Sequence, residues 1–451
     1  MKSAIIMAAG KGTRMKSEKP KCLHKVCDKT MIEHLIDTSK EAGAQKVVTI
    51  VGYGRDEMMS ALDGKCEFAI QDPQLGTGHA VMQAEQCEKE KGQTIVINGD
   101  CPCVQKEVMQ QLYHEVEKVA MAVLTVVTED PKSYGRVVRG KDGFIERIVE
   151  FKDCTEAEKK ICEINTGIYG FDNEILFSNL KEIKNNNQQQ EYYITDLVEI
   201  LNQKGCQVSA IQATSAQEVA GVNDQGELAQ ANQFMKKIIN EKWMDMGVVM
   251  LDPNTTYIGA DVILEAGVVL YPQTVLHGKT KISKGTTIYS QCYFNNAIIG
   301  ENCNIYSSQI IDSEVKEECN VGPYAHFRGH SVVEAKNRVG NFVEFKNTHF
   351  GYDSRCAHLT YLGDSEVGSG VNIGCGVVTV NYDGKNKFKT VIEDGAFIGS
   401  NSNLIAPITV GKRAVVAAGS TVTQDIHEGD MAIARSRQEN KPGYGSKYKD
   451  K

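Results

Sequence analysis

The chain has 451 residues, of which 41% are hydrophobic and 24% charged, a globular composition that excludes a disordered protein and allows two large domains. The net charge of -8 argues against a general nucleic-acid binder, although a few local cations suffice to bind one nucleotide. The 14 cysteines are scattered, and the sequence has no apolar stretch of the ~20 residues that a membrane span needs. We therefore expect a cytoplasmic protein with reduced thiols and no membrane contact.

Residues 1–226 alternate apolar runs with segments of helical spacing. Runs at 3–7, 46–51, 94–98 and 120–127 predict buried strands, and residues 31–42 and 78–87 predict helices. Strands that alternate with helices indicate an α/β domain with a mostly parallel sheet. In such sheets ligands bind beyond the carboxyl ends of the strands, which is where the unusual residues of this half fall.

A glycine-rich segment follows the first predicted strand. The glycines of Gly10-Lys11-Gly12 let backbone amides approach a phosphate, and Arg14 and Lys21 add positive charge. On its own this segment fits a plain tight turn equally well. Asp100 follows the strand at 94–98, where a carboxylate can hold Mg²⁺ or, alternatively, cap a helix.

Residues 227–247 have a different pattern, with apolar side chains mostly three or four residues apart. Leu228, Met235, Ile238 and Ile239 share one side of the predicted helix, and Gly247 gives it a plausible end. We interpret this segment as a helical linker between a first domain, residues 1–226, and a second domain, residues 248–451.

Residues 248–451 follow an apolar repeat of six, which no α-helix can keep on one face. It predicts a parallel β-helix in which one anchor per short side points inward. The anchors read from this period are Ile258, Leu264, Leu270, Leu276, Ile282, Ile288, Phe294, Ile299, Ile305, Ile311, Val321, Phe327, Val333, Val339, Phe345, Val367, Ile373, Ile392, Ile398, Leu404, Val410, Val416 and Val422.

The repeat is interrupted twice, at residues 350–366 and 380–391, and both interruptions predict loops. The first contains His358, the natural base to take a proton from an amine near neutral pH. Taken singly, a histidine in a loop is more often a surface residue with no catalytic role. Arg328 and Lys346 each follow an inward anchor, so both are expected to point outward, either as solvated charge or as phosphate ligands.

In combination these features resemble the sugar-phosphate nucleotidyltransferases and, with the repeat half, the bacterial bifunctional GlmU enzymes. The resemblance covers residues 4 to 440. It rests on segments 10–15, 20–21, 75–78, 99–100, 134–136, 163–167 and 221–223, together with Gln71 and Glu150. It implies a Rossmann-like nucleotidyltransferase domain followed by a left-handed β-helix. It also implies synthesis of UDP-N-acetylglucosamine, through acetyl transfer from acetyl-CoA to glucosamine-1-phosphate and uridylyl transfer from UTP to N-acetylglucosamine-1-phosphate.

The resemblance also implies roles for residues of the first half. Mg²⁺ would be held by Asp100 and Asn223. The residues that would contact UTP or the UDP-sugar are Ala8, Ala9, Gly10, Arg14, Lys21, Gln71, Gly76, Thr77, Gly135, Glu150, Asn165 and Asn223.

In the second half the resemblance makes His358 the catalytic base. Glucosamine-1-phosphate would contact Arg328, Lys346, Tyr361 and Asn372, and acetyl-CoA would contact Cys375, Asn381, Tyr382, Ser400, Ala418 and Arg435. A homotrimer with sites between subunits is implied as well. The polar tail with Lys441, Lys447, Lys449 and Lys451 either folds over the acetyl-CoA cleft or stays disordered.

Other functions fit parts of the sequence. A nucleotidyltransferase with one activity and a structural or regulatory β-helix would not need His358, Arg328 and Lys346 together. An acetyltransferase with a decayed first half would not keep Lys21 and Asp100, and a non-catalytic sensor could lose Asp100 or His358. The bifunctional enzyme accounts for all of these residues. It leaves the destination of the product open among peptidoglycan, teichoic acid and other glycans.

Overall fold

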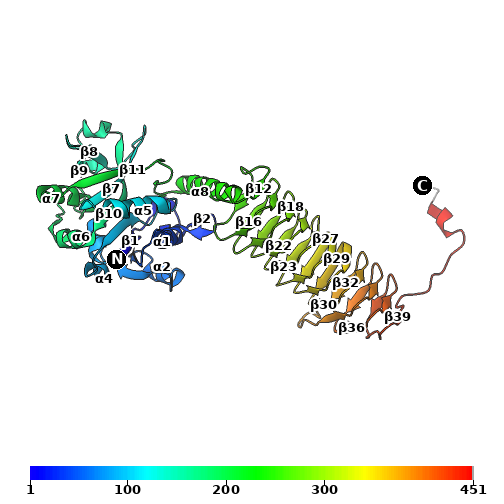
Figure 1. The fold of residues 1–451 in the computed structure, drawn as a ribbon. Coiled ribbons are helices and arrows are strands. Elements are labelled where there is room, and N and C mark those ends of the chain that lie inside the picture. Colours follow the sequence, from blue (N-terminus) through cyan, green and yellow to red (C-terminus); the bar gives the residue numbers. More distant parts are fainter. Residues whose placement is uncertain (449–451) are drawn as a thin grey trace. The chain divides into compact units, whose positions relative to one another are not determined.

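The computed structural model describes residues 1–448, so Lys449 and Lys451 of the predicted tail lie outside the described residues. The chain divides into two compact units, Met1–Lys236 and Lys237–Lys451. The division falls within α8 (Gln225–Asp245), the helix that the sequence predicts at 227–247 (Figure 1). The domain limits at 226 and 247 stay predictions. Among the described residues, no helix combines the length and apolar character needed to cross a membrane.

The first unit is built on one twisted sheet with the strand order β11-β7-β10-β6-β1-β4-β5. Four of its six pairings are parallel, and β10 runs antiparallel to β6 and β7. The strands are β1 (Lys2–Met7), β4 (Lys46–Val51), β5 (Glu67–Ile70), β6 (Gln93–Asn98), β7 (Met121–Val127), β10 (Glu163–Asp172) and β11 (Val208–Gln212), with the side strands β8 (Arg136–Arg139) and β9 (Ile145–Val149) and the hairpin β2 (Lys25–Val26) and β3 (Lys29–Thr30). The predicted, mostly parallel sheet is confirmed.

Helices cover both faces of this sheet because its strands are apolar on both sides. Along β1, Ala4 and Ile6 join one core with Leu35 and Met109, whereas Ile5 joins the opposite core. The helices are α1 (Met31–Glu41), α2 (Arg55–Ala61), α3 (Thr77–Met82), α4 (Glu85–Glu88), α5 (Lys106–Glu115), α6 (Asn173–Asn179) and α7 (Leu197–Gln203). The single helix predicted at 78–87 is two short helices, α3 and α4.

The second unit is a left-handed parallel β-helix with three faces (Figure 1). Face A contains β12 (Val249–Met250), β15 (Val269–Leu270), β18 (Thr287–Ile288), β21 (Asn304–Ile305), β24 (Asn320–Val321), β31 (Asn372–Ile373), β34 (Phe397–Ile398), β37 (Val415–Val416) and β39 (Met431–Ala432). Face B contains β13 (Tyr257–Ile258), β16 (Val275–His277), β19 (Tyr293–Asn295), β22 (Gln309–Ile311), β25 (His326–Arg328), β32 (Val378–Val380), β35 (Asn403–Ile405) and β38 (Thr421–Val422).

Face C contains β14 (Ile263–Leu264), β17 (Lys281–Ile282), β20 (Ile298–Ile299), β23 (Glu314–Val315), β26 (Val332–Val333), β28 (His349–Phe350), β30 (Ser365–Val367), β33 (Thr390–Ile392) and β36 (Ile408–Val410). Two longer strands, β27 (Arg338–Lys346) and β29 (Arg355–Gly363), continue from face A around the A/B corner into face B.

The structure confirms the six-residue period and corrects it at two places. Ile310, not Ile311, is the inward anchor, since Ile310 is fully buried and pairs with Phe294 and Phe327. The predicted loop at 350–366 is wrong. Phe350, Cys356 and Leu362 are fully buried anchors of an uninterrupted coil. The second predicted interruption is a real insertion, residues 381–389, between β32 and β33.

Candidate active sites

The loop after β1 closes against Lys21. Gly12 has φ +60°, and a Cβ atom there would lie 2.6 Å from Cβ of Lys21, so only glycine lets the loop approach this closely. The predicted nucleotide residues Ala8 and Ala9 are buried, whereas Gly10 and Arg14 are exposed at the open side of the loop. The exposed backbone of this loop therefore lies next to Lys21.

Lys21 joins the two predicted metal ligands. Its Nζ atom donates to Asn223 Oδ1 at 2.8 Å and forms an ion pair with Asp100. Glu227 accepts hydrogen bonds from the backbone N–H of Asn223 at 2.7 Å and from its Nδ2 at 3.1 Å, which turns Oδ1 toward the lysine. Residues that are far apart in the sequence thus converge on one cation.

The carboxylate of Asp100 and the side-chain amide oxygen of Asn223 fit Mg²⁺. A carboxylate and an amide oxygen are hard ligands, and their convergence on an ammonium group marks a position that favours positive charge. The neighbouring thiols do not compete for a softer metal, because burial raises the pKa of Cys22 to about 12 and raises the pKa of Cys101 well above its usual value, with the Asp100 charge adding to both shifts.

A cavity of about 230 Å³ opens beside this cluster. It is lined by four of the predicted nucleotide-sugar residues, Thr77, Gly135, Glu150 and Asn165. Burial raises the pKa of the Glu150 carboxyl. Asn165 donates from Nδ2 to the Tyr169 hydroxyl at 2.7 Å and accepts at Oδ1 from the Gly167 N–H at 3.1 Å, so its amide is held in one orientation.

Three of the residues predicted to contact UTP or the UDP-sugar, Gln71, Gly76 and Thr77, also lie together. Gln71 is buried at the end of β5 and donates from Nε2 to the Gly76 carbonyl at 2.9 Å. Thr77 begins α3, and its hydroxyl accepts from the Ile194 N–H at 3.1 Å. A Cβ atom on Gly76 would lie 2.6 Å from the Tyr192 carbonyl oxygen, so the backbone packs tightly there.

His358 lies on the regular strand β29, at the A/B corner of the second unit. Its Nδ1–H donates to Asn341 Oδ1 at 3.1 Å, and the two residues are paired in register between β29 and β27. Both line a surface hollow of about 450 Å³ together with Arg338 and Tyr306. The imidazole is exposed and its second nitrogen, Nε2, is available to a substrate.

Three of the predicted sugar-phosphate residues gather on face B beside β29. Arg328 and Lys346 are paired in register on neighbouring coils, and Arg328 forms an ion pair with Glu344. A Cβ atom on Gly363 would lie 2.4 Å from the Tyr361 hydroxyl, so the Tyr361 ring lies over the glycine that pairs with Lys346. Lys387 and Arg328 hold the pKa of Lys346 below its usual value, as expected for a cluster of cations.

Asn372 does not join this group within one chain. It lies on face A and pairs with Arg355 at the beginning of β29. A column of predicted acetyl-CoA residues lies along the A/B corner, on the coils that follow His358 in the chain. It consists of Cys375, Ser400, Ala418 and Arg435. The column is connected by hydrogen bonds from Gly376 N to Leu359 O, from Asn401 N to Cys375 O and from Gly419 N to Ser400 O, at 2.7 to 2.8 Å.

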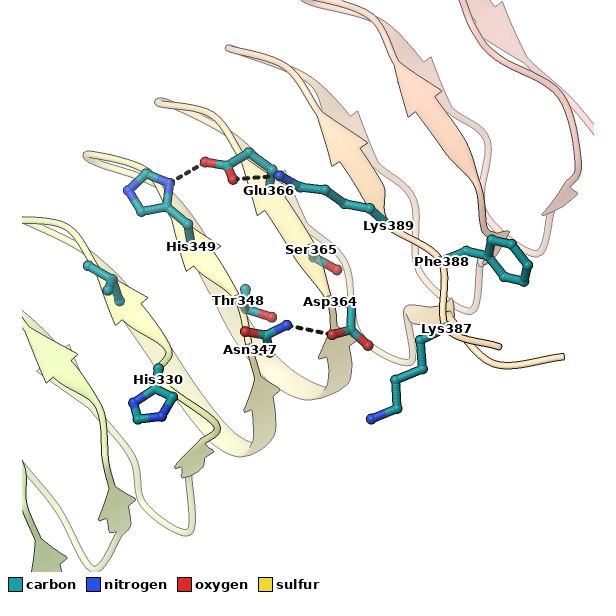
Figure 2. A pocket seen from close by; sticks show the side chains of 11 residues that line it. His330, Asn347, Thr348, His349, Asp364, Ser365, Glu366, Lys387, Phe388 and Lys389 are labelled. Carbon is teal, nitrogen blue, oxygen red and sulfur yellow. Dashed lines mark hydrogen bonds and ion pairs between the residues drawn. The ribbon is translucent and has the colours of Figure 1, made fainter. Parts of the chain in front are cut away.

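The other two predicted acetyl-CoA residues, Asn381 and Tyr382, belong to the insertion at the B/C corner. Asp364 holds this insertion in place by accepting from Asn381 Nδ2 at 2.5 Å and from Asn347 Nδ2, on the preceding coil, at 2.6 Å. Figure 2 shows the Asn347–Asp364 contact, with Lys387 of the insertion on the same side of the cavity. The Tyr382 ring is exposed, and its hydroxyl donates to the Gly384 carbonyl at 2.6 Å.

The sequence interpretation missed the residues that hold these side chains in place. Asn341, Asp364 and Glu227 contact predicted site residues and carried no assignment of their own. For Asn341 a signal was present, because it precedes His358 by 17 residues, about one coil of the β-helix. The same interval of 17 residues separates Asp364 from Asn381 of the insertion, whereas no such period connects Glu227 with Asn223.

Comparisons with known proteins match both halves of the chain. The Nucleotidyl transferase family matches residues 3–250, and the family described as Hexapeptide repeat of succinyl-transferase matches residues 389–424. Proteins named Bifunctional protein GlmU are similar over nearly the whole length. They include proteins from Shouchella clausii (50% identical), Bacillus subtilis (49%) and Halalkalibacterium halodurans (48%), each aligned over 98% of this chain and 97 to 98% of its own.

Proposed function

The chain belongs to the GlmU family of bifunctional proteins, and from this premise we propose that it makes UDP-N-acetylglucosamine from glucosamine-1-phosphate in two successive transfers. The observation that carries the proposal is the presence in one chain of two separate groups of reactive residues. Lys21, Asp100 and Asn223 form the first group, and His358 with Arg328, Lys346 and Tyr361 forms the second.

Acetyl transfer is the first reaction. Arg328, Lys346 and Tyr361 bind the phosphate and sugar of glucosamine-1-phosphate, while the column at the A/B corner and the insertion bind acetyl-CoA. Nε2 of His358 removes a proton from the amine, whose nitrogen then forms a bond to the thioester carbonyl carbon. The carbon–sulfur bond breaks and coenzyme A leaves, taking up a proton as its thiol. The exposed His358 and the half-buried Tyr361, three residues apart on β29, support this assignment.

Uridylyl transfer is the second reaction. The phosphate oxygen of N-acetylglucosamine-1-phosphate is already anionic, so its attack on the α-phosphorus of UTP needs no general base, and pyrophosphate leaves. Lys21, Arg14 and the backbone edge of the loop bind phosphate oxygens. Glu150 and Asn165 hold the sugar, and Gln71, Gly76 and Thr77 bind the uracil. Mg²⁺, held by Asp100 and Asn223, would neutralise charge on the phosphates.

The acetyltransferase unit acts as a homotrimer. A row of exposed side chains runs along the A/B corner and ends beside His358. It consists of Tyr306, Tyr324, Phe342 and Leu359, and we call it the aromatic stripe after its three aromatic members. The rings of Tyr324 and Phe342 are stacked with their centroids 5.5 Å apart. Solvent-exposed apolar side chains in a continuous row favour burial against another copy of the chain. Both reactions belong in the cytoplasm, where UTP and acetyl-CoA are made, and all 14 cysteines are free thiols.

The assay that tests the proposal contains the protein with glucosamine-1-phosphate, acetyl-CoA, UTP and Mg²⁺. We expect free thiol and pyrophosphate to appear. His358→Ala should abolish thiol release and leave uridylyl transfer to added N-acetylglucosamine-1-phosphate intact, and Asp100→Ala should do the reverse. If the wild-type protein releases pyrophosphate but no thiol, the second unit is a structural β-helix and the protein is a nucleotidyltransferase with one activity.

A further inference from the structure

Asn341 faces the proposed base across two neighbouring coils whose backbones lie close together. A Cβ atom on Gly340 would lie 1.8 Å from the Ala357 carbonyl oxygen, so the two backbones abut at the A/B corner. Asn341 and His358 come next and are paired in register. The contact between Asn341 Oδ1 and His358 Nδ1 at 3.1 Å is therefore set by the backbone as well as by the side chains.

An amide oxygen can only accept a hydrogen bond, so this contact requires the proton of the neutral imidazole to be on Nδ1. The lone pair is then on Nε2, the nitrogen that faces outward and receives the proton of the substrate amine. Among the described residues that line the hollow, Arg338 is the one permanently charged group, and Arg355 pairs with Arg338 at the edge of β29. No carboxylate lines the hollow in this part of the chain, so a neutral amide alone orients the ring.

We propose that Asn341 is a positioning residue for acetyl transfer, which fixes His358 in the tautomer and orientation that leave Nε2 free as the base. The proposal rests on the assignment of His358 as the base and adds the residue that prepares it. An amide suits this role because its oxygen accepts the hydrogen bond from Nδ1 and carries no charge.

The test measures thiol release for Asn341→Ala in the full-length protein, with Asn304→Ala as the matched control. Asn304 is an outward-facing, half-buried asparagine on face A that does not line the hollow. We expect kcat of acetyl transfer to fall about 10- to 100-fold in Asn341→Ala, with KM for both substrates changed by less than about 2-fold, because the ring loses its orientation and not its substrate contacts. Uridylyl transfer should be unchanged, which reports that the first unit is folded, and the unchanged KM values for acetyl transfer report that the second unit is folded.

Two further variants separate positioning from a merely structural role. When His358→Ala is already present, Asn341→Ala should cause no additional loss of rate, because there is no ring left to orient. Asn341→Asp keeps an oxygen acceptor and should restore most of kcat at high pH. The acidic limb of its pH–rate profile should shift upward by about 1 pH unit, since a carboxylate stabilises the imidazolium.

An Asn341→Ala protein with wild-type kcat would overturn the positioning role while leaving the base assignment intact. The same holds if Asn341→Ala lowers the rate equally with and without His358. A His358→Ala protein that still releases thiol at the wild-type rate would instead overturn the base assignment, and the positioning role with it.

Discussion

Asp196 shows how burial near a binding cavity changes the acid–base behaviour of a single residue. It immediately precedes α7 and follows Ile194 and Thr195, which line the proposed sugar cavity. Burial, with the nearby charges of Glu199 and Asp153, raises the pKa of its carboxyl from 3.8 to about 6. The folded protein thus binds this proton more tightly than the unfolded chain does, and the ionised carboxylate lowers stability at neutral pH.

Asp196→Asn should therefore stabilise the protein in a pH-dependent way. The gain is absent below about pH 4, where the carboxyl is protonated in both states, grows between pH 4 and 6, and is complete above pH 6. Because the side chain is partly exposed, we expect a gain of about 1 kcal/mol at pH 8. Denaturant unfolding of the wild type and the variant at pH 4 and pH 8 measures it. An equal gain at both pH values would show that ionisation of Asp196 is not the cause.

At the residue scale, the sequence and the resemblance predicted candidate reactive side chains but not the side chains that hold them. His358, Lys21 and Asp100 were recognisable because their chemistry is specific and their motifs are local. Asn341 and Asp364 act through contacts between neighbouring coils, and such contacts depend on the register of the β-helix. A shift from six to five residues between anchors changes that register, as it does between Ile305 and Ile310.

At the scale of elements, the interruption predicted at 350–366 was wrong because the six-residue period does not restart in phase. Phe350 follows Phe345 by five residues, and Cys356, the next anchor, was not counted because cysteine is a less distinctive core residue than valine or isoleucine. Thr379 is likewise a fully buried anchor, and its polar hydroxyl is paired with the Gly363 N–H at 2.8 Å. The insertion at 381–389 was predictable because it breaks the period completely.

Asp364 should hold this insertion in the position in which it binds acetyl-CoA. Asp364→Ala removes the acceptor of Asn381 Nδ2, so we expect KM for acetyl-CoA to rise about 10-fold with uridylyl transfer unchanged. Initial rates of thiol release against acetyl-CoA concentration measure this.

Asp312→Ala is the matched control for this prediction. Asp312 has the same φ of 46° and also accepts from an asparagine of the preceding coil, Asn296 at 2.9 Å, but holds no insertion. If both variants raise KM equally, the effect comes from the coil and not from the insertion.

At the scale of the whole molecule, the resemblance implies a homotrimer, and the aromatic stripe is the surface that we expect the trimer to bury. Three copies of the 49.6 kDa chain should give a particle of about 149 kDa in sedimentation equilibrium. Phe342→Glu places a charge in the middle of the stripe, where burial against another copy would leave it unpaired. The variant should sediment as smaller species and lose acetyl transfer, while uridylyl transfer continues.

Ile263→Glu serves as the control for this substitution, since Ile263 is 50% exposed but lies on face C, away from the stripe. It should leave both the mass and acetyl transfer as in the wild type. A Phe342→Glu protein that keeps the full mass and the full acetyl-transfer rate would show that the stripe is not the contact between subunits.

We propose that the two units divide the chemistry between them, and a mixing experiment tests this most directly. Asp100→Ala and His358→Ala proteins are incubated separately and together with glucosamine-1-phosphate, acetyl-CoA, UTP and Mg²⁺, and UDP-N-acetylglucosamine is quantified by chromatography. We predict none from either variant alone, and formation after a lag in the mixture, as N-acetylglucosamine-1-phosphate made by the first variant is used by the second. A mixture of folded proteins that makes no product, or a single variant that makes it alone, would contradict the account.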